Sequence, residues 1–227
     1  MNRLAVTSGA AALLLLAGAA RAEPPAAAPP PEQHVRGVIA ALDGDRLEIK
    51  VPGGKRVQVQ LAAGAHLTVA VRADLASVGP GLFVGTTAVA QPDGSLRALE
   101  VHLFPESMRG LGAGHRPWDL QPGSSMTNAT VSAVQAAPAP PAGSSMTNAT
   151  VARATSTPAG LKLTLQDPSG QRTVLVPPGV PVVRLEPGDR SRLVAGAHVF
   201  AAGPRQADGV VLVQRLVVGQ GSLRPPM

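Results

Sequence analysis

Two short stretches near the start of the chain alternate between polar and apolar residues, and a glycine turn joins them. In RLEIKV (46–51) and RVQVQL (56–61), every second residue is apolar, and PGG separates them at 52–54. A repeat of two is typical of a half-buried strand, and the glycine pair favours a tight reversal between antiparallel strands. No segment sustains a helical repeat. We therefore expect an all-β protein.

The pattern recurs in the second half of the chain. VGPGLFV at 78–84 corresponds to LVAGAHV at 193–199, and the turn dipeptide DG at 93–94 corresponds to DG at 208–209. Each pair is 115 residues apart, and a constant offset indicates a duplicated domain of about 70 residues. Five or six short strands per copy predict two tandem OB-like β-barrels. An open sandwich fits almost as well.

The first residues have the composition of a secretory signal peptide. Arg3 is followed by an apolar run over 10–20 and by the small-x-small pattern Ala20-Arg21-Ala22. The expected organisation is a signal peptide (1–22), a Pro/Ala-rich tether (23–33), a first β domain (34–104), a connector and proline-rich spacer (105–146), a second β domain (147–220) and a tail (221–227). The protein is thus expected in the periplasm or outside the cell, with no transmembrane span after signal cleavage.

One nine-residue sequence, GSSMTNATV, occurs at 123–131 and again at 143–151. The second copy would lead into the first strand of the second domain, which we place at 147–155. The first copy leads into a proline-rich stretch. Local duplication explains the repeat, with one copy in a strand and the other in the linker. The sequence does not decide which copy joins the sheet, because both carry the same residues.

Composition restricts the partners. The chain has no cysteine, which excludes disulfides, thiolate metal sites and cysteine nucleophiles. Of 20 basic residues, Arg3 and Arg21 lie in the leader, which leaves 18 against 14 acidic residues. The arginines are scattered, and aromatic residues make up only 2% of the chain. Nucleic acid is not an expected partner, because base stacking needs aromatic side chains.

The segment 104–122 holds the candidate ligand site. It contains the only tryptophan of the chain among polar side chains that can bind a ligand. The candidate residues are Arg109, His115, Arg116, Trp118 and Asp119. The alternative is that Trp118 fills an apolar hole in a linker.

A weaker alternative is a metal site. Nitrogen and oxygen ligands from His102, His115 and Asp119, with Glu106 nearby, suit zinc, manganese or iron. No expected hairpin or helix obliges these residues to converge. No cofactor is expected, and no nucleophile lies in a G-x-S-x-G elbow.

Two stretches, VRGVIAALDGDRLEIKVPGGKRVQVQL (35–61) and DGSLRALEVHL (93–103), carry a resemblance to a known family. Together with GLKLTLQDPSGQRTVLV (160–176), they resemble the DUF5666 family of small exported bacterial β domains. The resemblance implies a fold but no catalytic residues. Some similar proteins are labelled metal-transporter permeases, a label that conflicts with the lack of multiple apolar segments here.

These observations predict a non-enzymatic periplasmic binding or scaffold protein. An envelope protein, a glycan or a polyanion would be its partner, since arginine pairs well with anions. The first alternative is a periplasmic metal-binding or metal-delivery protein. The second is an envelope hydrolase with a site between the domains, although the sequence offers no positioned acid–base pair.

Overall fold

The computed structural model describes residues 32–137 and 160–227, and within them the predicted all-β fold is confirmed. Three 3-10 turns (Leu75–Ser77, Glu106–Met108 and Arg190–Arg192) are the helical elements of these residues. The strands are β1 (Glu32–Asp43), β2 (Arg46–Lys50), β3 (Arg56–Ala73), β4 (Phe83–Ala90), β5 (Leu96–Leu103), β6 (Gly114–Pro117), β7 (Ser124–Ala136), β8 (Leu161–Asp167), β9 (Gly170–Val176), β10 (Val182–Pro187), β11 (His198–Pro204) and β12 (Val211–Gly219).

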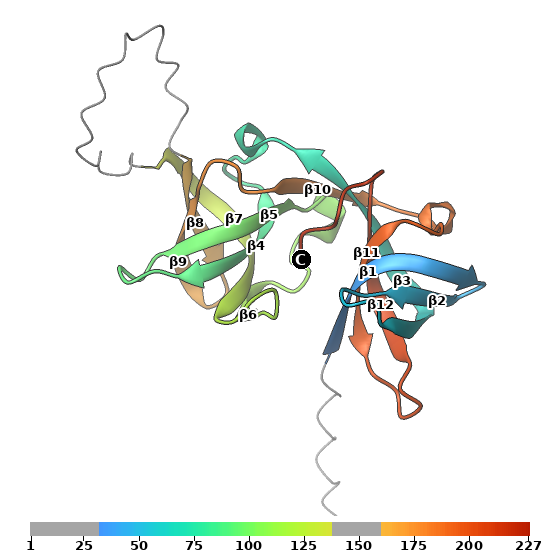
Figure 1. Ribbon diagram of the computed structural model, residues 1–227. Helices are drawn as coiled ribbons and strands as arrows, with labels where there is room; N and C mark the ends of the chain where they lie inside the picture. Colours follow the sequence, from blue (N-terminus) through green and yellow to red (C-terminus); the bar gives the residue numbers. More distant parts are fainter. Residues whose placement is uncertain (1–31, 138–159) are drawn as a thin grey trace, which may run out of the picture. The chain divides into compact units, whose positions relative to one another are not determined.

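Five strands form a closed barrel, the first ring. Its order is β12-β11-β1-β2-β3, and β3 pairs back onto β12. Figure 1 shows the blue strand β1 beside the orange-red strands β11 and β12, so the two ends of the described chain meet in one ring. The interior is aliphatic and includes Ile49, Leu61, Val213 and Leu216, each at most 3% exposed.

A second ring follows the order β5-β4-β7-β8-β9. Its last contact is short, because β9 pairs with β5 through two residue pairs, Leu96 with Val174 and Arg97 with Leu175. Leucine and valine again fill the interior, with Val84, Leu163 and Leu165 fully buried. The chain therefore forms both interiors with few aromatic residues, because branched aliphatic side chains fill them.

Strand β10 joins the two rings. It lies antiparallel to the second half of β3 and parallel to the end of β5. One of the two middle pairs of its contact with β3 is Leu185 with Ala70. A third apolar cluster covers this junction and includes Phe200, Val217 and, at its edge, Trp118.

The parallel contact that closes each ring has the same register at a fixed offset. In the second ring Leu96 pairs with Val174, and in the first ring Val211 pairs with Val59, so both partners differ by 115 positions (96 and 211, 59 and 174). Leu185 and Ala70 differ by the same number (70 and 185) and pair with one another. A local two-fold relation between the halves therefore passes through this pair.

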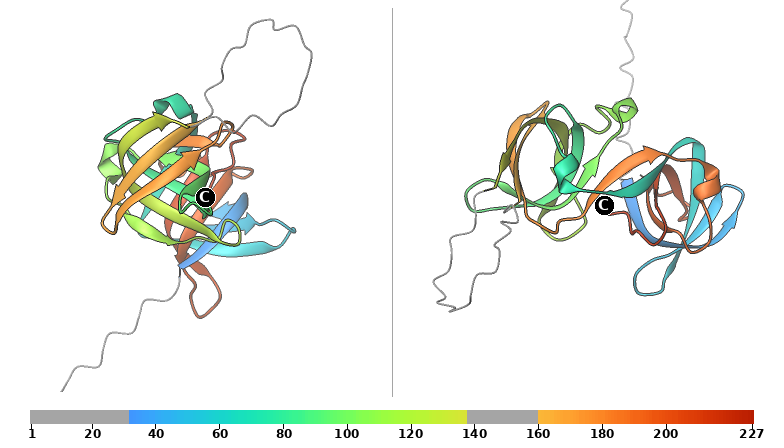
Figure 2. Two further views of the ribbon diagram at one scale, coloured as in Figure 1. Left: turned by 90° about the vertical axis from the view of Figure 1, so that its left-hand side faces the viewer. Right: turned by 90° about the horizontal axis from the view of Figure 1, so that it is seen from above.

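The distribution of strands differs from the tandem arrangement expected from the sequence. The strands of the expected first domain, 34–104, are divided: β1–β3 belong to the first ring and β4–β5 to the second. The last two strands of the expected second domain complete the first ring. The cause is β3, which continues for 18 residues and leaves its own hairpin to pair with β10. Figure 2 shows from two further directions that each ring combines strands from both halves of the sequence, which differ in colour.

The first GSSMTNATV copy joins the sheet. It supplies the start of β7, which pairs with β4, β6 and β8. The expected connector, 105–146, therefore contains two strands, β6 and β7. The strand predicted at 147–155, with the second copy at 143–151, lies outside the described residues, as do the predicted signal peptide and most of the predicted tether.

Register shifts change which side chains face outward. Thr87 and Ala88 of β4 pair with Glu100 and Ala98 of β5, so Leu99 of β5 is an extra residue. A bulge shifts the alternation by one position. Ala98 and Val101 consequently point into the second ring, whereas Glu100 and His102 belong to its outer side. The register also shifts before Arg215, because Val213 pairs with Leu61 and Arg215 with His66, which leaves three extra residues in β3.

Candidate functional site

Residues 104–123, which are called the connector from here on, fold over the outer side of the second ring. A 3-10 turn (Glu106–Met108) and the short strand β6 lead into a loop that ends at Ser124. The Ser124 hydroxyl lies 3.0 Å from the carbonyl oxygen of Trp118 and 2.7 Å from that of Gln121. The main chain of Trp118 also donates to Ser124 O at 2.9 Å. These bonds fix the position of Trp118.

Trp118 packs against the first ring. Its ring centroid lies 4.2 Å from that of His34 on β1 and 6.1 Å from that of Phe200 on β11. The guanidinium of Arg116 sits 5.5 Å from the indole centroid, a distance typical of a cation–π contact. The indole Nε1 is buried and has no hydrogen-bond partner among the described residues. Trp118 thus fills apolar space and also presents an unused donor.

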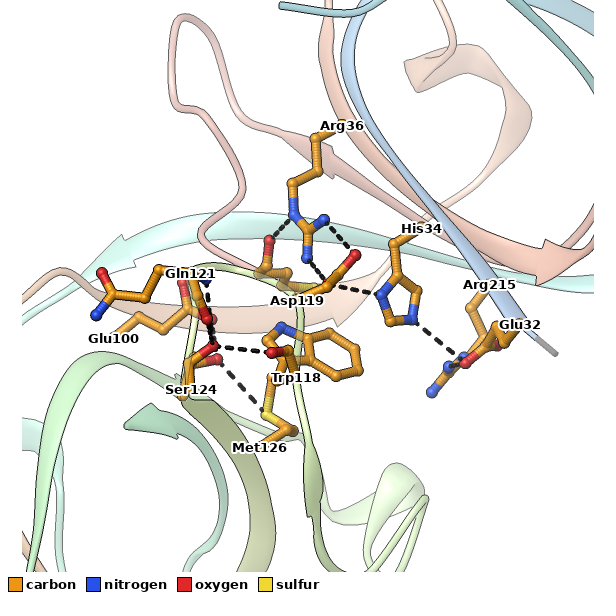
Figure 3. Close-up of polar contacts among 12 residues, drawn as sticks. Glu32, His34, Arg36, Glu100, Trp118, Asp119, Gln121, Ser124, Met126 and Arg215 are labelled. Atoms are coloured by element: carbon orange, nitrogen blue, oxygen red, sulfur yellow. Dashed lines mark hydrogen bonds and ion pairs between the residues drawn. The ribbon is translucent and has the colours of Figure 1, made fainter. Parts of the chain in front are cut away.

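Asp119 anchors the connector to β1 through ion pairs. Arg36 donates to its two carboxylate oxygens at 2.6 and 3.1 Å, and His34 Nδ1 lies 2.8 Å from Oδ1 (Figure 3). Burial alone would raise the pKa of Asp119, but the bonds from Arg36 and His34 dominate and lower this pKa to about 2. Asp119 is therefore a structural anchor whose oxygens are already occupied.

A second carboxylate, that of Glu32 on β1, also has a lowered pKa and occupied oxygens. His34 and Arg215 lower the pKa of Glu32 to about 2, against the effect of burial. His34 Nε2 is 3.6 Å from Glu32, too long for a direct hydrogen bond, so the 2.6 Å bond from Arg215 is the stronger contact.

Beneath the connector lies a buried polar group formed by β4 and β5. Glu100 and His102 are 2% and 1% exposed, and Glu100 Oε1 lies 3.4 Å from His102 Nε2. The hydroxyl of Thr87 donates to the same Oε1 at 2.5 Å. The bulge at Leu99 places this group on the outer side, and the connector and its neighbours then cover it.

A cavity of about 60 Å³, which we call the central cavity, adjoins this group. Its wall is mostly apolar and is built by Phe104, Met108, Leu111, Trp118, Met126, Leu185, Phe200, Val217 and Met227. The polar side chains in the wall are His66, Thr68, His102, Arg116, Asn128 and Arg215. An apolar pocket with a few polar groups is the usual form of a small-molecule site.

Three side chains of this wall each carry a buried polar atom with no hydrogen-bond partner among the described residues. The atoms are His102 Nε2, Trp118 Nε1 and Asn128 Oδ1. Asn128 is 5% exposed, and its Nδ2 donates to Leu111 O at 3.2 Å, which fixes the amide orientation. Buried polar atoms are nearly always paired in native proteins, so three such atoms around one cavity indicate groups that a ligand or water satisfies.

Arg116 adds positive charge to the wall. Its Nη1 donates to Gly112 O at 2.9 Å, and within the described part of the chain it forms no ion pair. Burial lowers the pKa of Arg116 from its usual range, and the positive charge of Arg215 lowers it further. A half-buried guanidinium without a carboxylate partner favours an anion nearby.

The structure separates the residues that the sequence analysis grouped. Arg116 and Trp118 line the central cavity, and Asp119 does not. Arg109 forms an ion pair with Glu106 on the connector surface. The His115 ring, which is partly buried, bonds to Thr127 at 2.8 Å. This partial burial and the charges of nearby arginines lower the pKa of His115.

The proposed metal ligands His102, His115 and Asp119 each contact different partners. Over residues 32–137 and 160–227, no group of three histidine, cysteine, aspartate or glutamate side chains is arranged to hold a metal ion. Sequence reasoning used His102 only as a metal ligand and missed His66, Asn128 and Arg215. The break in alternation at Leu99 was the available signal for the buried Glu100–His102 group.

Comparison with known proteins gives no relative: no protein-family model matches the chain, and no curated protein or solved structure is significantly similar to it. In the described residues, no helix has the length and apolar character needed to cross a membrane.

Proposed function

We propose that this protein is an exported, non-enzymatic binding protein whose ligand occupies the central cavity. The cavity carries the proposal, because it combines an apolar wall with buried polar atoms that lack partners. Such atoms cost about 1–3 kcal/mol each when left unpaired, and a ligand that satisfies them recovers part of that cost. The signal-like sequence at 1–22 supports a periplasmic or secreted location.

The fold supports a specific origin for the cavity. We propose that the chain is a duplicated, DUF5666-like domain in which the two copies exchange their last two strands and form two OB-like barrels. The matched registers at an offset of 115 support this origin. The cavity adjoins the Leu185–Ala70 pair, where the halves meet, and so belongs to neither copy alone.

A fragment screen tests the binding function. Small neutral aromatic probes, such as benzyl alcohol and benzamide, are added to the purified protein and binding is followed by ligand-observed NMR. The expected result is binding that the cavity-filling substitution Leu111→Phe weakens, whereas Leu42→Phe, on the exposed surface of β1, leaves it unchanged. If none of the probes binds, or if the two variants bind the probes equally well, the proposal is overturned.

A further inference from the structure

We propose that the central cavity binds a small carboxylate with a short apolar body. This inference rests on the binding function above and adds the chemical class of the ligand. Three kinds of observation carry it: the balance of donors and acceptors in the wall, the charge of the wall, and the size and polarity of the space.

Donors outnumber acceptors among the unused polar groups. The indole Nε1 of Trp118 can only donate, and four of the five N–H groups of Arg116 have no partner among the described residues. His102 Nε2 lies 3.4 Å from Glu100 Oε1 and is not counted among these donors. Asn128 Oδ1 is the acceptor in this set. A ligand rich in acceptor oxygens fits this wall better than one rich in donors.

The charge of the wall selects an anion. Arg116 and Arg215 both line the cavity, and Arg215 is already paired with Glu32. Arg116 therefore remains the guanidinium that an incoming anion meets. The planar fork of arginine matches the two oxygens of a carboxylate, and such charge-assisted bonds are about twice as strong as neutral ones.

The space limits the apolar body. About 60 Å³ exceeds the roughly 10–15 Å³ that one water needs, yet it is far below the roughly 300–1,000 Å³ of sites for drug-sized ligands. Phe104, Leu185 and Val217 supply an apolar wall opposite the polar groups. A short branched chain therefore fits as the space stands, with its carboxylate toward Arg116. A single ring, which needs a cavity of about 150 Å³, fits only if side chains of the wall move.

The test compares benzoate with benzamide, which has nearly the same shape and no charge. Binding to the full chain is measured by isothermal titration calorimetry and by the fluorescence of Trp118, the only tryptophan. Benzoate is expected to bind at least tenfold more tightly than benzamide. The substitution Arg116→Gln should weaken benzoate binding at least tenfold more than benzamide binding and so remove this preference. Arg192→Gln, which removes the same charge outside the cavity wall, should change neither affinity.

A second variant keeps the test decisive if Arg116→Gln fails to fold. Asn128 Nδ2 and Arg116 Nη2 both lie beside Gly112, at 3.3 and 3.6 Å from the position that a Cβ would occupy there. Asn128→Asp places a carboxylate of nearly unchanged shape beside the guanidinium and should weaken benzoate binding at least tenfold. Equal affinities for benzoate and benzamide overturn the carboxylate class but leave the binding function standing. Absence of binding by both overturns the two proposals together.

Discussion

Thr86 and Thr87 are consecutive, fully buried residues of β4 with opposite hydrogen-bonding states. The hydroxyl of Thr87 donates to Glu100 at 2.5 Å, whereas the hydroxyl of Thr86 has no partner among the described residues. Replacing either threonine with valine keeps the shape of the side chain. The two substitutions differ only in whether they remove a formed hydrogen bond.

The expected effects on stability have different signs. Thr87→Val leaves the buried Oε1 of Glu100 without its hydroxyl donor, which costs about 1–3 kcal/mol of unfolding free energy. Thr86→Val removes a buried hydroxyl that gains nothing, so stability should be unchanged or should rise by up to about 1 kcal/mol. The predicted difference between the variants is therefore about 1–4 kcal/mol.

Urea denaturation followed by far-UV circular dichroism measures this difference. Both variants should keep the slope of the parent protein, so that the shift in midpoint reports stability alone. If Thr86→Val destabilises the protein as much as Thr87→Val, or more, then the Thr87–Glu100 hydrogen bond does not stabilise the protein as described.

Two further predictions address the ion pairs and the exchange of strands. The pKa of Asp119 is lowered from 3.8 to about 2, so its pairs stabilise the protein above about pH 4 and lose this effect as the pH falls toward 2. The carboxylate is 52% exposed, which limits the contribution to less than about 1 kcal/mol. In acid titrations of stability, Asp119→Asn should flatten the curve between pH 4 and 2, and an unchanged curve would exclude this assignment. Leu61 and Val213 are paired on neighbouring strands of the first ring. A double-mutant cycle with Leu61→Ala and Val213→Ala should give a coupling of about 0.5–3 kcal/mol, whereas additive effects would mean that the two strands belong to different domains.

The sequence predicts the strands better than it predicts their partners. Alternation in 46–51 and 56–61 correctly indicated β2 and β3, because the pattern reports which face of a strand is buried. The same pattern carries no information on which strand lies next to it. Nothing in the alternation of β3 distinguishes a strand that turns back into its own ring from one that continues to β10. The exchange of β4–β5 for β11–β12 was therefore not predictable from periodicity.

The site was predicted in part for a related reason. Trp118 and Arg116 stand out in composition, and both line the cavity. Asn128 lies in a repeated sequence, and the sequence does not decide which copy joins the sheet. The sequence assigned no role to Arg215. Their roles depend on the junction between the rings and on the register shifts before Glu100 and Arg215, which are properties of strand pairing.

The indole N–H of Trp118 offers the most direct test of the account. The chain has one tryptophan, so a ¹H–¹⁵N spectrum contains one indole resonance, which reports a buried donor without a partner in the described residues. Addition of benzoate should shift this resonance downfield as the donor gains an acceptor, with saturation at the affinity measured by calorimetry. The claim that the central cavity is the ligand site would be contradicted if benzoate binds and this resonance does not move. It would also be contradicted if no concentration of benzoate moves the resonance.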